Sequence, residues 1–438
     1  MTQTLIRARL LSYLREPQTP DDTDAMRYIE DGALLLEGGK IIAMGEAATI
    51  HAPDATVIDH RPHLAMAGFI DTHLHFPQTQ VIASWAAELL DWLNDYTFPE
   101  ETRYADPALC ATMASAFLDR LTDHGTTTAV AYASVHATSA DALFAEAQRR
   151  DMRLITGKVL MDRNAPDALR DTAQTGYDDT KRLIARWHGA GRLSYAITPR
   201  FAITSTPSQM EAAQALALEH PDCYIQTHLS ENHAEIALSC QLYPQAQDYT
   251  DIYTRYGLLR HNSLLGHAIH LSDREIGALA DAQAKPVFCP TSNLFLGSGL
   301  FDDAKLRAAG LVNAIATDIG GGTSYSLLQT LAEGYKVLQL QRQRLHPLRA
   351  FHWITRGNAV ALRLVDKIGT LDAGTEADIV IVNAHATPAM AQRMARARSL
   401  VDELFTLQVM GDDRAIVQTY VAGKPRKVTS PEPAQAPA

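Results

Sequence analysis

The sequence predicts an α/β fold: a (β/α)8 TIM-like barrel with a small β-sandwich domain built from both chain ends. Three observations support this prediction. In the middle of the chain, eight short apolar segments alternate with helical stretches, which is typical of parallel βα units. The two ends of the chain consist mainly of strand and turn patterns. The length of 438 residues also exceeds what one small domain requires.

Both chain ends have the composition of β-strands. Residues 33–44 contain two apolar runs separated by Gly38 and Gly39, a pattern typical of a hairpin with a glycine turn. Near the C-terminus, residues 377–382 and 415–421 have the same strand-like composition. We therefore expect the two ends to pair in one small domain that flanks the barrel.

The domain prediction divides the chain into four parts. The central part is the barrel, and the parts before and after it form the sandwich. The last residues, which are rich in Pro and Ala, are expected to be a disordered tail. The predicted parts are residues 1–66 (sandwich, N-terminal part), 67–365 (barrel), 366–428 (sandwich, C-terminal part) and 429–438 (tail).

Eight candidate strands define the barrel. An open, doubly wound sheet is the alternative, but no G-x-G-x-x-G pattern opens a helix in this chain. Eight parallel strands within about 300 residues favour a closed barrel. The candidates are residues 67–71, 127–132, 154–160, 193–198, 224–228, 263–267, 286–289 and 312–318.

Composition excludes several classes of protein. The formal net charge of −11 argues against a nucleic-acid-binding protein, which usually has a basic face. The four cysteines form no C-x-x-C pair, so a cysteine-based zinc site is not expected. No run of 18 apolar residues predicts a membrane helix, and the N-terminus lacks the pattern of a signal peptide. We expect a cytoplasmic enzyme that binds neither nucleic acid nor membrane.

The chemistry is predicted from the residues at the strand ends, because the C-terminal ends of barrel strands meet at one site. The first candidate strand ends in His73 and His75, which face the same way on an extended strand and can chelate a divalent metal together. The fifth ends in His228, and Glu231 follows where a proton shuttle would be needed.

The sixth and eighth candidate strands add two more such residues. The sixth ends at His267. The eighth ends at Asp318, which can bind a metal and also accept a proton from water. Residues 320–322 are all glycine, which lets the backbone pass close to a ligand. Five residues with metal-binding side chains are therefore predicted to meet at one end of the barrel.

This set of residues resembles the amidohydrolase superfamily. The flanking residues 67–73 and the segment 369–382 are similar to that family as well, so the resemblance covers nearly the whole chain. Binuclear members bridge two metals with a carboxylated lysine, usually at the end of strand four. Here strand four ends at Arg200, and Lys158 lies inside strand three with an expected structural role. The resemblance thus implies one metal, held by His73, His75, His228 and Asp318.

Within that superfamily the chain is similar to the guanine deaminases. The resemblance rests on residues 71–78, 161–167, 198–202, 226–232, 289–299 and 317–320. It implies that Gln78 and Arg200 hydrogen-bond a purine base and that Phe201 packs on it. The implied substrate-binding set is Gln78, Arg200, Phe201, His228, Glu231, His267 and Asp318. Trp85, Trp92 and Tyr96 follow the histidine pair, and we expect them to pack in the core or to form a wall of the pocket rather than a nucleic-acid platform.

The resemblance also implies a reaction: hydrolytic deamination of guanine to xanthine and ammonia, with Glu231, Asp318 and His267 as catalytic residues. The expected cofactor is one divalent metal, Zn²⁺ or Fe²⁺, and the expected assembly is a homodimer. Two alternatives stay open at this point. The chain could deaminate a related heterocycle such as 8-oxoguanine, a pterin or a triazine, or it could be a catalytically silent barrel.

Overall fold

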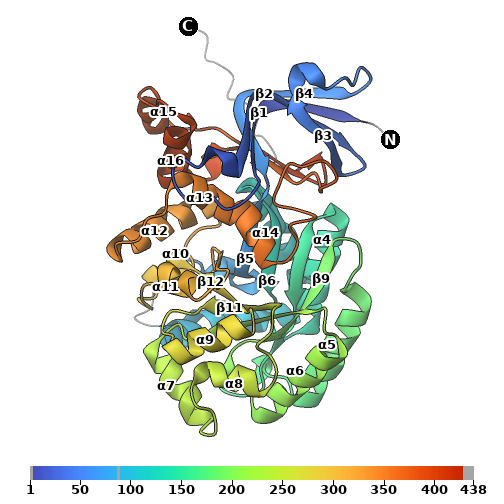
Figure 1. The fold of residues 1–438 in the computed structure, drawn as a ribbon. Helices are drawn as coiled ribbons and strands as arrows, with labels where there is room; N and C mark the ends of the chain where they lie inside the picture. Colours follow the sequence, from blue (N-terminus) through green and yellow to red (C-terminus); the bar gives the residue numbers. More distant parts are fainter. Residues whose placement is uncertain (1–2, 86–88, 428–438) are drawn as a thin grey trace.

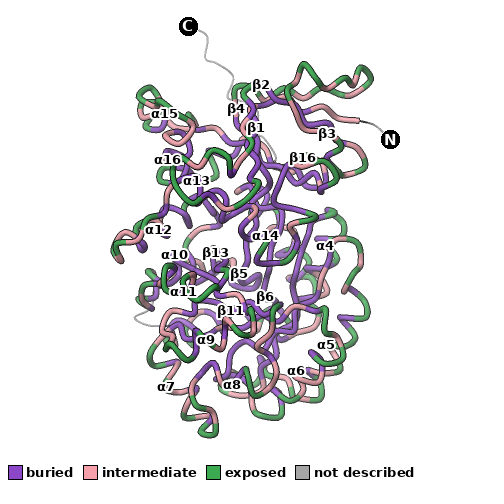
Figure 2. Tube along the Cα trace, in the orientation of Figure 1, coloured by how far each residue is buried: buried purple, intermediate pink, exposed green. Residues whose placement is uncertain are grey.

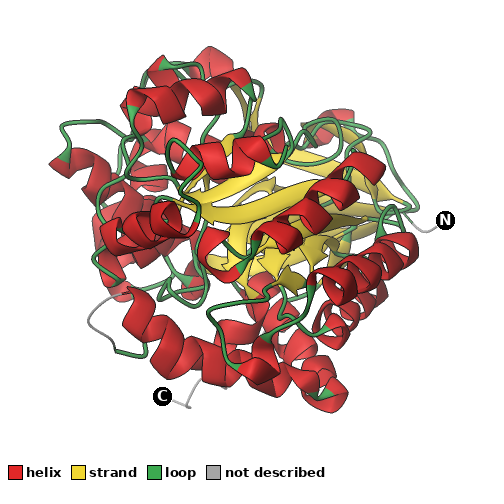
Figure 3. Cartoon of the chain, turned by 90° about the horizontal axis from the view of Figure 1, so that it is seen from below, coloured by secondary structure: helices red, strands yellow, loops and turns green. Residues whose placement is uncertain are grey.

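The computed structural model describes residues 3–85 and 89–427, and it consists of two sheets with helices around them (Figure 1). The first and last described segments of the chain form the smaller sheet, while the middle of the chain forms the larger one (Figure 1). Viewed from below, helices surround the strands (Figure 3). The predicted barrel with an additional sheet built from both ends is confirmed.

The larger sheet contains nine strands that are all parallel to their neighbours. Eight of them follow one another around the barrel, and β8 (Val159–Leu160) pairs with the end of β9. The eight are β5 (Phe69–His75), β6 (Thr126–Tyr132), β7 (Arg153–Gly157), β9 (Leu193–Pro199), β10 (Tyr224–Leu229), β11 (Ser263–His267), β12 (Lys285–Phe288) and β13 (Ala314–Ile315).

Side chains join the first and last strands of the barrel, β5 and β13. Asp71 accepts hydrogen bonds from the backbone N–H and the hydroxyl of Thr317, at 3.1 and 2.5 Å. The Asn358 amide donates to the carbonyls of Ile70 and Ile315, at 2.7 and 2.8 Å. These contacts hold the two strands at a fixed register, so that the residues following β13 lie beside the end of β5.

Helices cover the barrel, and most of the longer ones begin at a side chain that caps the first turn. In α5, for example, the Thr172 hydroxyl accepts from the backbone N–H of Thr175. These helices are α3 (Pro107–Asp123), α4 (Ala137–Arg150), α5 (Ala173–Trp187), α6 (Pro207–Glu219), α7 (His233–Leu242), α8 (Tyr249–Arg255), α9 (Asp273–Asp281), α10 (Pro290–Phe295), α11 (Asp303–Ala308), α12 (Leu327–Leu340), α13 (Pro347–His352) and α14 (Asn358–Ala361).

The smaller sheet has the strand order β16-β15-β14-β4-β1-β2-β3 and is mostly antiparallel. Its strands are connected in one hydrogen-bonded path, in which the register of β1 shifts near Ala8 against both β2 and β4. Its strands are β1 (Thr4–Tyr13), β2 (Met26–Glu37), β3 (Lys40–Glu46), β4 (Thr56–Ala67), β14 (Ile379–Val382), β15 (Ile416–Val421) and β16 (Lys424–Pro425).

The C-terminal part also contains two helices that the strand-rich pattern did not predict, α15 (Pro388–Met394) and α16 (Leu400–Met410). The Ser399 side chain caps α16, and Glu403 of this helix forms an ion pair with Arg9 of β1. This ion pair connects α16 to the N-terminal strand β1.

A helical segment between β5 and α3 contributes to the C-terminal end of the barrel. Its described part includes α1 (Leu89–Trp92) and α2 (Phe98–Thr102). Leu89, Trp92 and Phe98 are buried in an apolar cluster with Phe201, which follows β9. This segment therefore closes over the strand ends at which the polar residues were predicted to meet.

The buried residues follow the barrel strands and the inward faces of the helices (Figure 2). The domain boundaries at residues 66 and 365 remain a prediction. The predicted disordered tail, residues 429–438, lies outside the described residues. Within residues 3–85 and 89–427, the structure has no helix long and apolar enough to cross a membrane.

Candidate active site

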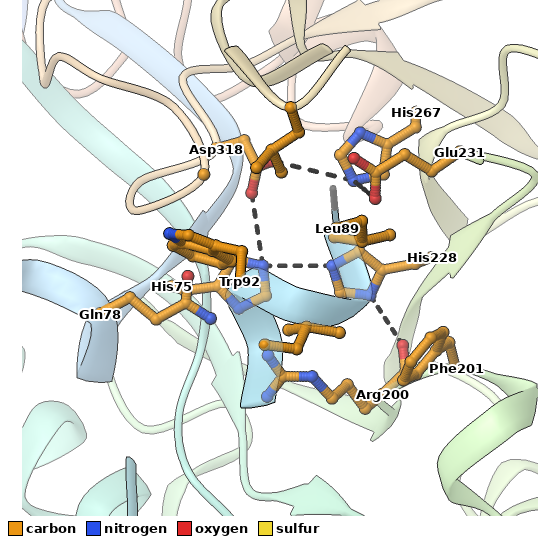
Figure 4. Close-up of a pocket in the computed structure, with 13 residues that line it drawn as sticks. His75, Gln78, Leu89, Trp92, Arg200, Phe201, His228, Glu231, His267 and Asp318 are labelled. Carbon is orange, nitrogen blue, oxygen red and sulfur yellow. Dashed lines mark hydrogen bonds and ion pairs between the residues drawn. The ribbon is translucent and has the colours of Figure 1, made fainter. Parts of the chain in front are cut away.

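The predicted site residues come together in one pocket at the C-terminal ends of the barrel strands (Figure 4). The metal-binding side chains lie on one side of the pocket, and Gln78, Arg200 and Phe201 lie near them (Figure 4). His73 is not among the lining residues, but its ring centroid lies 4.8 Å from that of His228. Of the predicted residues, the lining includes His75, Gln78, Arg200, Phe201, His228, Glu231, His267 and Asp318.

Four potential ligand atoms converge in the pocket. Asp318 Oδ1 lies 3.4 Å from the Nε2 atoms of both His73 and His75, and His75 Nε2 lies 3.2 Å from His228 Nε2. Nitrogen ligands about 2.0–2.1 Å from a tetrahedral zinc ion lie about 3.3 Å from one another. The buried Nε2 of His73 has no hydrogen-bond partner among the described residues. This arrangement fits one divalent metal.

The surrounding backbone orients these ligands. The Nδ1 of His228 is 2.7 Å from the carbonyl oxygen of Arg200, which leaves Nε2 directed into the site. Asp318 has a φ of 54°, in the left-handed region, and its N–H donates to the carbonyl of His73 at 2.9 Å. This turn points the carboxylate at the histidines rather than along the strand.

The buried groups have the protonation states that metal binding requires. Burial lowers the pKa of His75 to about 4 and holds the pKa of His228 well below its usual value, so both imidazoles are neutral. Burial would raise the pKa of Asp318, but the adjacent imidazoles of His73 and His75 hold it well below the usual value. Neutral imidazoles and an ionised carboxylate are the metal-binding forms.

Glu231 lies on the other side of the potential ligands. Its Oε2 is 3.2 Å from His267 Nε2, and its Oε1 accepts a hydrogen bond from the Ser298 hydroxyl at 2.9 Å. Burial, and then the negative charge of Asp318, raise the pKa of Glu231 well above its usual value. A buried carboxyl with a raised pKa can hold and transfer a proton near neutral pH.

His267 is oriented by a side chain that the sequence analysis did not single out. Asn293 Nδ2 lies 2.8 Å from His267 Nδ1 and donates to it, so the ring proton resides on Nε2. That Nε2 faces Glu231 Oε2 and lies 3.7 Å from Asp318 Oδ2. Burial lowers the pKa of His267 to about 3, so this side chain is a neutral donor.

The recognition side of the pocket consists of Gln78, Arg200 and Phe201. Gln78 and Arg200 are 1% and 3% exposed, respectively, and both contact the buried carboxylate of Glu101. Trp92 lines the pocket with Leu89 and Leu93, as predicted. The same prediction was wrong for Trp85, which is 77% exposed. The pocket thus combines apolar walls with fixed hydrogen-bonding groups, as expected for a small aromatic ligand.

Lys158 does not reach the site. It is buried, and its ammonium group pairs with Asp171 at 2.5 Å and donates to the carbonyl of Val159. This agrees with the structural role expected from the sequence, and it leaves Arg200 at the end of β9. The described residues therefore offer no lysine that could bridge a second metal at this site.

Sequence reasoning missed several residues that support the site. Asn293 and Ser298 lie in segment 289–299, which the resemblance included without giving either residue a role. Tyr132 stacks on His75 with ring centroids 4.5 Å apart. Glu101 follows Glu100 in a short acidic stretch that looks like an ordinary helix surface. Only the segment around Asn293 carried a signal that could have identified its residues.

Comparison with known proteins supports this geometry. The model of the amidohydrolase family matches residues 64–426. The chain belongs to the amidohydrolase family, among the guanine deaminases. Guanine deaminase of Escherichia coli (strain K12) is 46% identical over 427 residues, which cover 97% of each chain. Members of this family typically depend on a metal. The structure offers two groups of potential metal ligands here, one formed by His73, His228 and His267 and the other by His73, Cys289 and Asp318.

Solved structures show the same relationship. The structure of the Escherichia coli guanine deaminase has a TM-score of 0.94 and 45% identity, and the match covers 96% of this chain and 99% of that one. A guanine deaminase from C. acetobutylicum, solved with guanine bound in its active site, has a TM-score of 0.86 and 27% identity. That match covers 97% of this chain and 100% of the other.

Proposed function

We propose that the protein hydrolyses guanine to xanthine and ammonia. The observation that carries the proposal is the position of Gln78 and Arg200 in one pocket with the metal-binding side chains. A planar base held by these groups can present one ring carbon to the catalytic side chains. The high identity to the guanine deaminase of Escherichia coli supports the same substrate.

The proposed cofactor is one Zn²⁺, held by His73, His75, His228 and Asp318. The three nitrogen donors and single carboxylate favour zinc, and Fe²⁺ is the alternative for the same ligand set. When bound, such a metal supplies an activated water at neutral pH. The four side chains would hold it at the end of the pocket that also contains Glu231 and His267.

Proton transfers are assigned to Asp318 and Glu231. The Asp318 carboxylate accepts a proton from the attacking water, whose oxygen forms a bond to C2 of guanine. Protonated Glu231 donates to the ring nitrogen beside C2, and His267 donates its Nε2 proton in a hydrogen bond to the new oxygen. The exocyclic nitrogen then takes the proton held by Asp318, the bond from C2 to that nitrogen breaks, and ammonia leaves. The hydroxyl on C2 returns its proton to Glu231 as the second carbonyl of xanthine forms, which restores both side chains to their starting states.

Recognition of the base is assigned to Gln78, Arg200 and Phe201. Guanine carries a carbonyl oxygen and ring nitrogens that accept hydrogen bonds, and a guanidinium can donate to such an edge in two places. The Phe201 ring packs against the base. His228, Glu231, His267 and Asp318 contact the reacting end, so they belong to the substrate-binding set as well.

The test is turnover of guanine by the purified protein, followed as xanthine and ammonia, with and without a chelator. We expect chelator-sensitive formation of both products in equal amounts. A panel of 8-oxoguanine, a pterin and a triazine separates the alternative substrates. Failure of metal-loaded protein to convert guanine would contradict the proposed substrate.

We further propose that the enzyme is a cytoplasmic homodimer. The four cysteines are all free, as expected in a reducing compartment. The dimer rests on the family resemblance, and the molar mass of the purified protein in solution tests it.

A further inference from the structure

A buried carboxylate links the two polar recognition residues of the pocket. Glu101 lies in α2 and is 0% exposed. Its Oε1 accepts hydrogen bonds from Gln78 Nε2 at 2.9 Å and from Arg200 Nη1 at 2.8 Å. Its Oε2 accepts a second bond from Arg200 Nη1, also at 2.8 Å. One side chain therefore holds both recognition groups.

These contacts fix the orientation of the Gln78 amide. The N–H of Gly320 donates to Gln78 Oε1 at 3.0 Å, while Gln78 Nε2 donates to Glu101. Reversing the amide would place its NH2 group against the N–H of Gly320 and its oxygen against the Glu101 carboxylate. Both contacts would be repulsive, so Gln78 offers the pocket its remaining N–H as a donor.

Glu101 also determines the net charge of the recognition groups. Arg200 is 3% exposed, and among the described residues Glu101 is the only carboxylate within 4.0 Å of its guanidinium. The Phe98 ring lies on another side of the guanidinium, 5.5 Å away. Both bonds to Glu101 come from Nη1, so Nη2 and Nε of Arg200 stay available as donors. The pair thus presents hydrogen-bond donors without a net charge.

This neutrality matters because substrate and product of the proposed reaction differ in acidity. Guanine is neutral at physiological pH. Xanthine has a second ring carbonyl, which makes its ring N–H groups more acidic, so part of the product is an anion of nearly the same shape. An uncompensated buried arginine would bind that anion strongly, because opposite charges attract more in a site with little water.

We propose that Glu101 is a positioning residue that determines specificity. By neutralising Arg200 and fixing Gln78, it makes the pocket select a neutral purine base over an anionic oxopurine of the same shape. The inference rests on the proposed function for the identity of the substrate, but the role of Glu101 can be tested by binding alone.

The test uses E101Q and, as a matched control, E100Q. Glu100 is the adjacent residue in α2, and its carboxylate pairs with Arg103 rather than with the pocket. Xanthine binding to the metal-loaded proteins is measured by calorimetry at a mildly acidic pH, where xanthine is neutral, and at a mildly alkaline pH, where it is an anion. Comparing proteins at the same pH removes the titration of Glu231, Asp318 and other shared groups from the result.

We expect E101Q to shift the ratio of anion affinity to neutral affinity toward the anion by about tenfold or more, about 1.4 kcal/mol. E100Q should keep the wild-type ratio. With E101Q, the KM for guanine should rise and xanthine should inhibit more strongly at alkaline pH. An unchanged affinity ratio in folded E101Q would overturn the proposal.

Two further variants apply if E101Q does not fold. E101D keeps the charge, so it should retain the wild-type affinity ratio while kcat/KM falls because Gln78 is held less well. The double variant E101Q/R200Q removes both charges and should also return the ratio to the wild-type value. An anion preference in either variant would refute the role of charge. Guanine turnover by the wild-type protein is measured separately from xanthine binding. If the wild-type protein did not convert guanine, the proposed substrate would be wrong, but the binding experiment would still test the role of Glu101.

Discussion

At Gly266 of β11, the addition of a single methyl group should displace a ligand of the metal site. A Cβ at this position would lie 2.4 Å from Cε1 of His73, whereas ordinary contacts begin near 3.4 Å. The His73 ring would therefore have to move by about 1 Å, the difference between these two distances. The φ of Gly266 lies outside the left-handed region, so alanine itself adds no backbone strain.

We expect G266A to lose metal affinity by about 10–100-fold and kcat/KM by about 100-fold, because ligand displacement of this size has such effects. Metal content after dialysis and the rate of guanine turnover are the measurements. The control is G277A in α9, where a new Cβ meets nothing within 4 Å. That variant should keep full activity and gain up to about 1 kcal/mol of stability. If G266A bound metal and turned over guanine as the wild type does, the steric argument would be wrong.

Three further outcomes are expected. E231Q should lower kcat by about 100–10,000-fold and still hold the metal, since Glu231 transfers protons and is not a ligand; loss of metal would contradict that division of roles. Removing the metal with a chelator should abolish turnover and lower the melting temperature, and Zn²⁺ should restore both; turnover by protein verified as metal-free would count against metal-dependent chemistry. Burial, and then the nearby arginines led by Arg356, lower the pKa of His352 from 6.5 to about 3. Between these two pH values the unfolded chain binds a proton at His352 and the folded protein does not. The free energy of unfolding is therefore unaffected by His352 above pH 6.5 and falls as the pH decreases toward 3. Replacing it in H352Q should therefore flatten the acid side of the stability curve by up to about 1.4 kcal/mol per pH unit, measured by urea unfolding, and an unchanged curve would exclude this contribution.

The barrel and the metal-binding set could be predicted because both depend on local patterns. Each ligand follows an apolar strand, and parallel strands bring their C-terminal ends together whatever lies between them. For that reason His73, His228 and Asp318 could be placed in one site from the sequence. The strand β11 was even predicted with its observed bounds, Ser263–His267.

What could not be predicted depends on contacts between distant segments. Glu101 and Arg200 are 99 residues apart, and Ser298 and Glu231 are 67 residues apart. No local pattern distinguishes such a glutamate or serine from a surface residue. The predicted strand 312–318 shortened to β13 (Ala314–Ile315) because Thr317 and Asp318 bond to β5 residues through side-chain and irregular backbone contacts rather than a regular ladder.

The contact between Asp71 and Thr317 has a consequence for the making of the protein. These residues are 246 positions apart, and they bring the ligands of the first strand to the ligand that follows the last. A ribosome must therefore complete nearly the whole barrel before the metal site exists. Partly synthesised or truncated chains that end before this point cannot assemble the four-ligand site. Binding of the metal by all four ligands should accordingly occur only after Asp318 has left the exit tunnel. Such binding would therefore report that synthesis of the barrel is nearly complete.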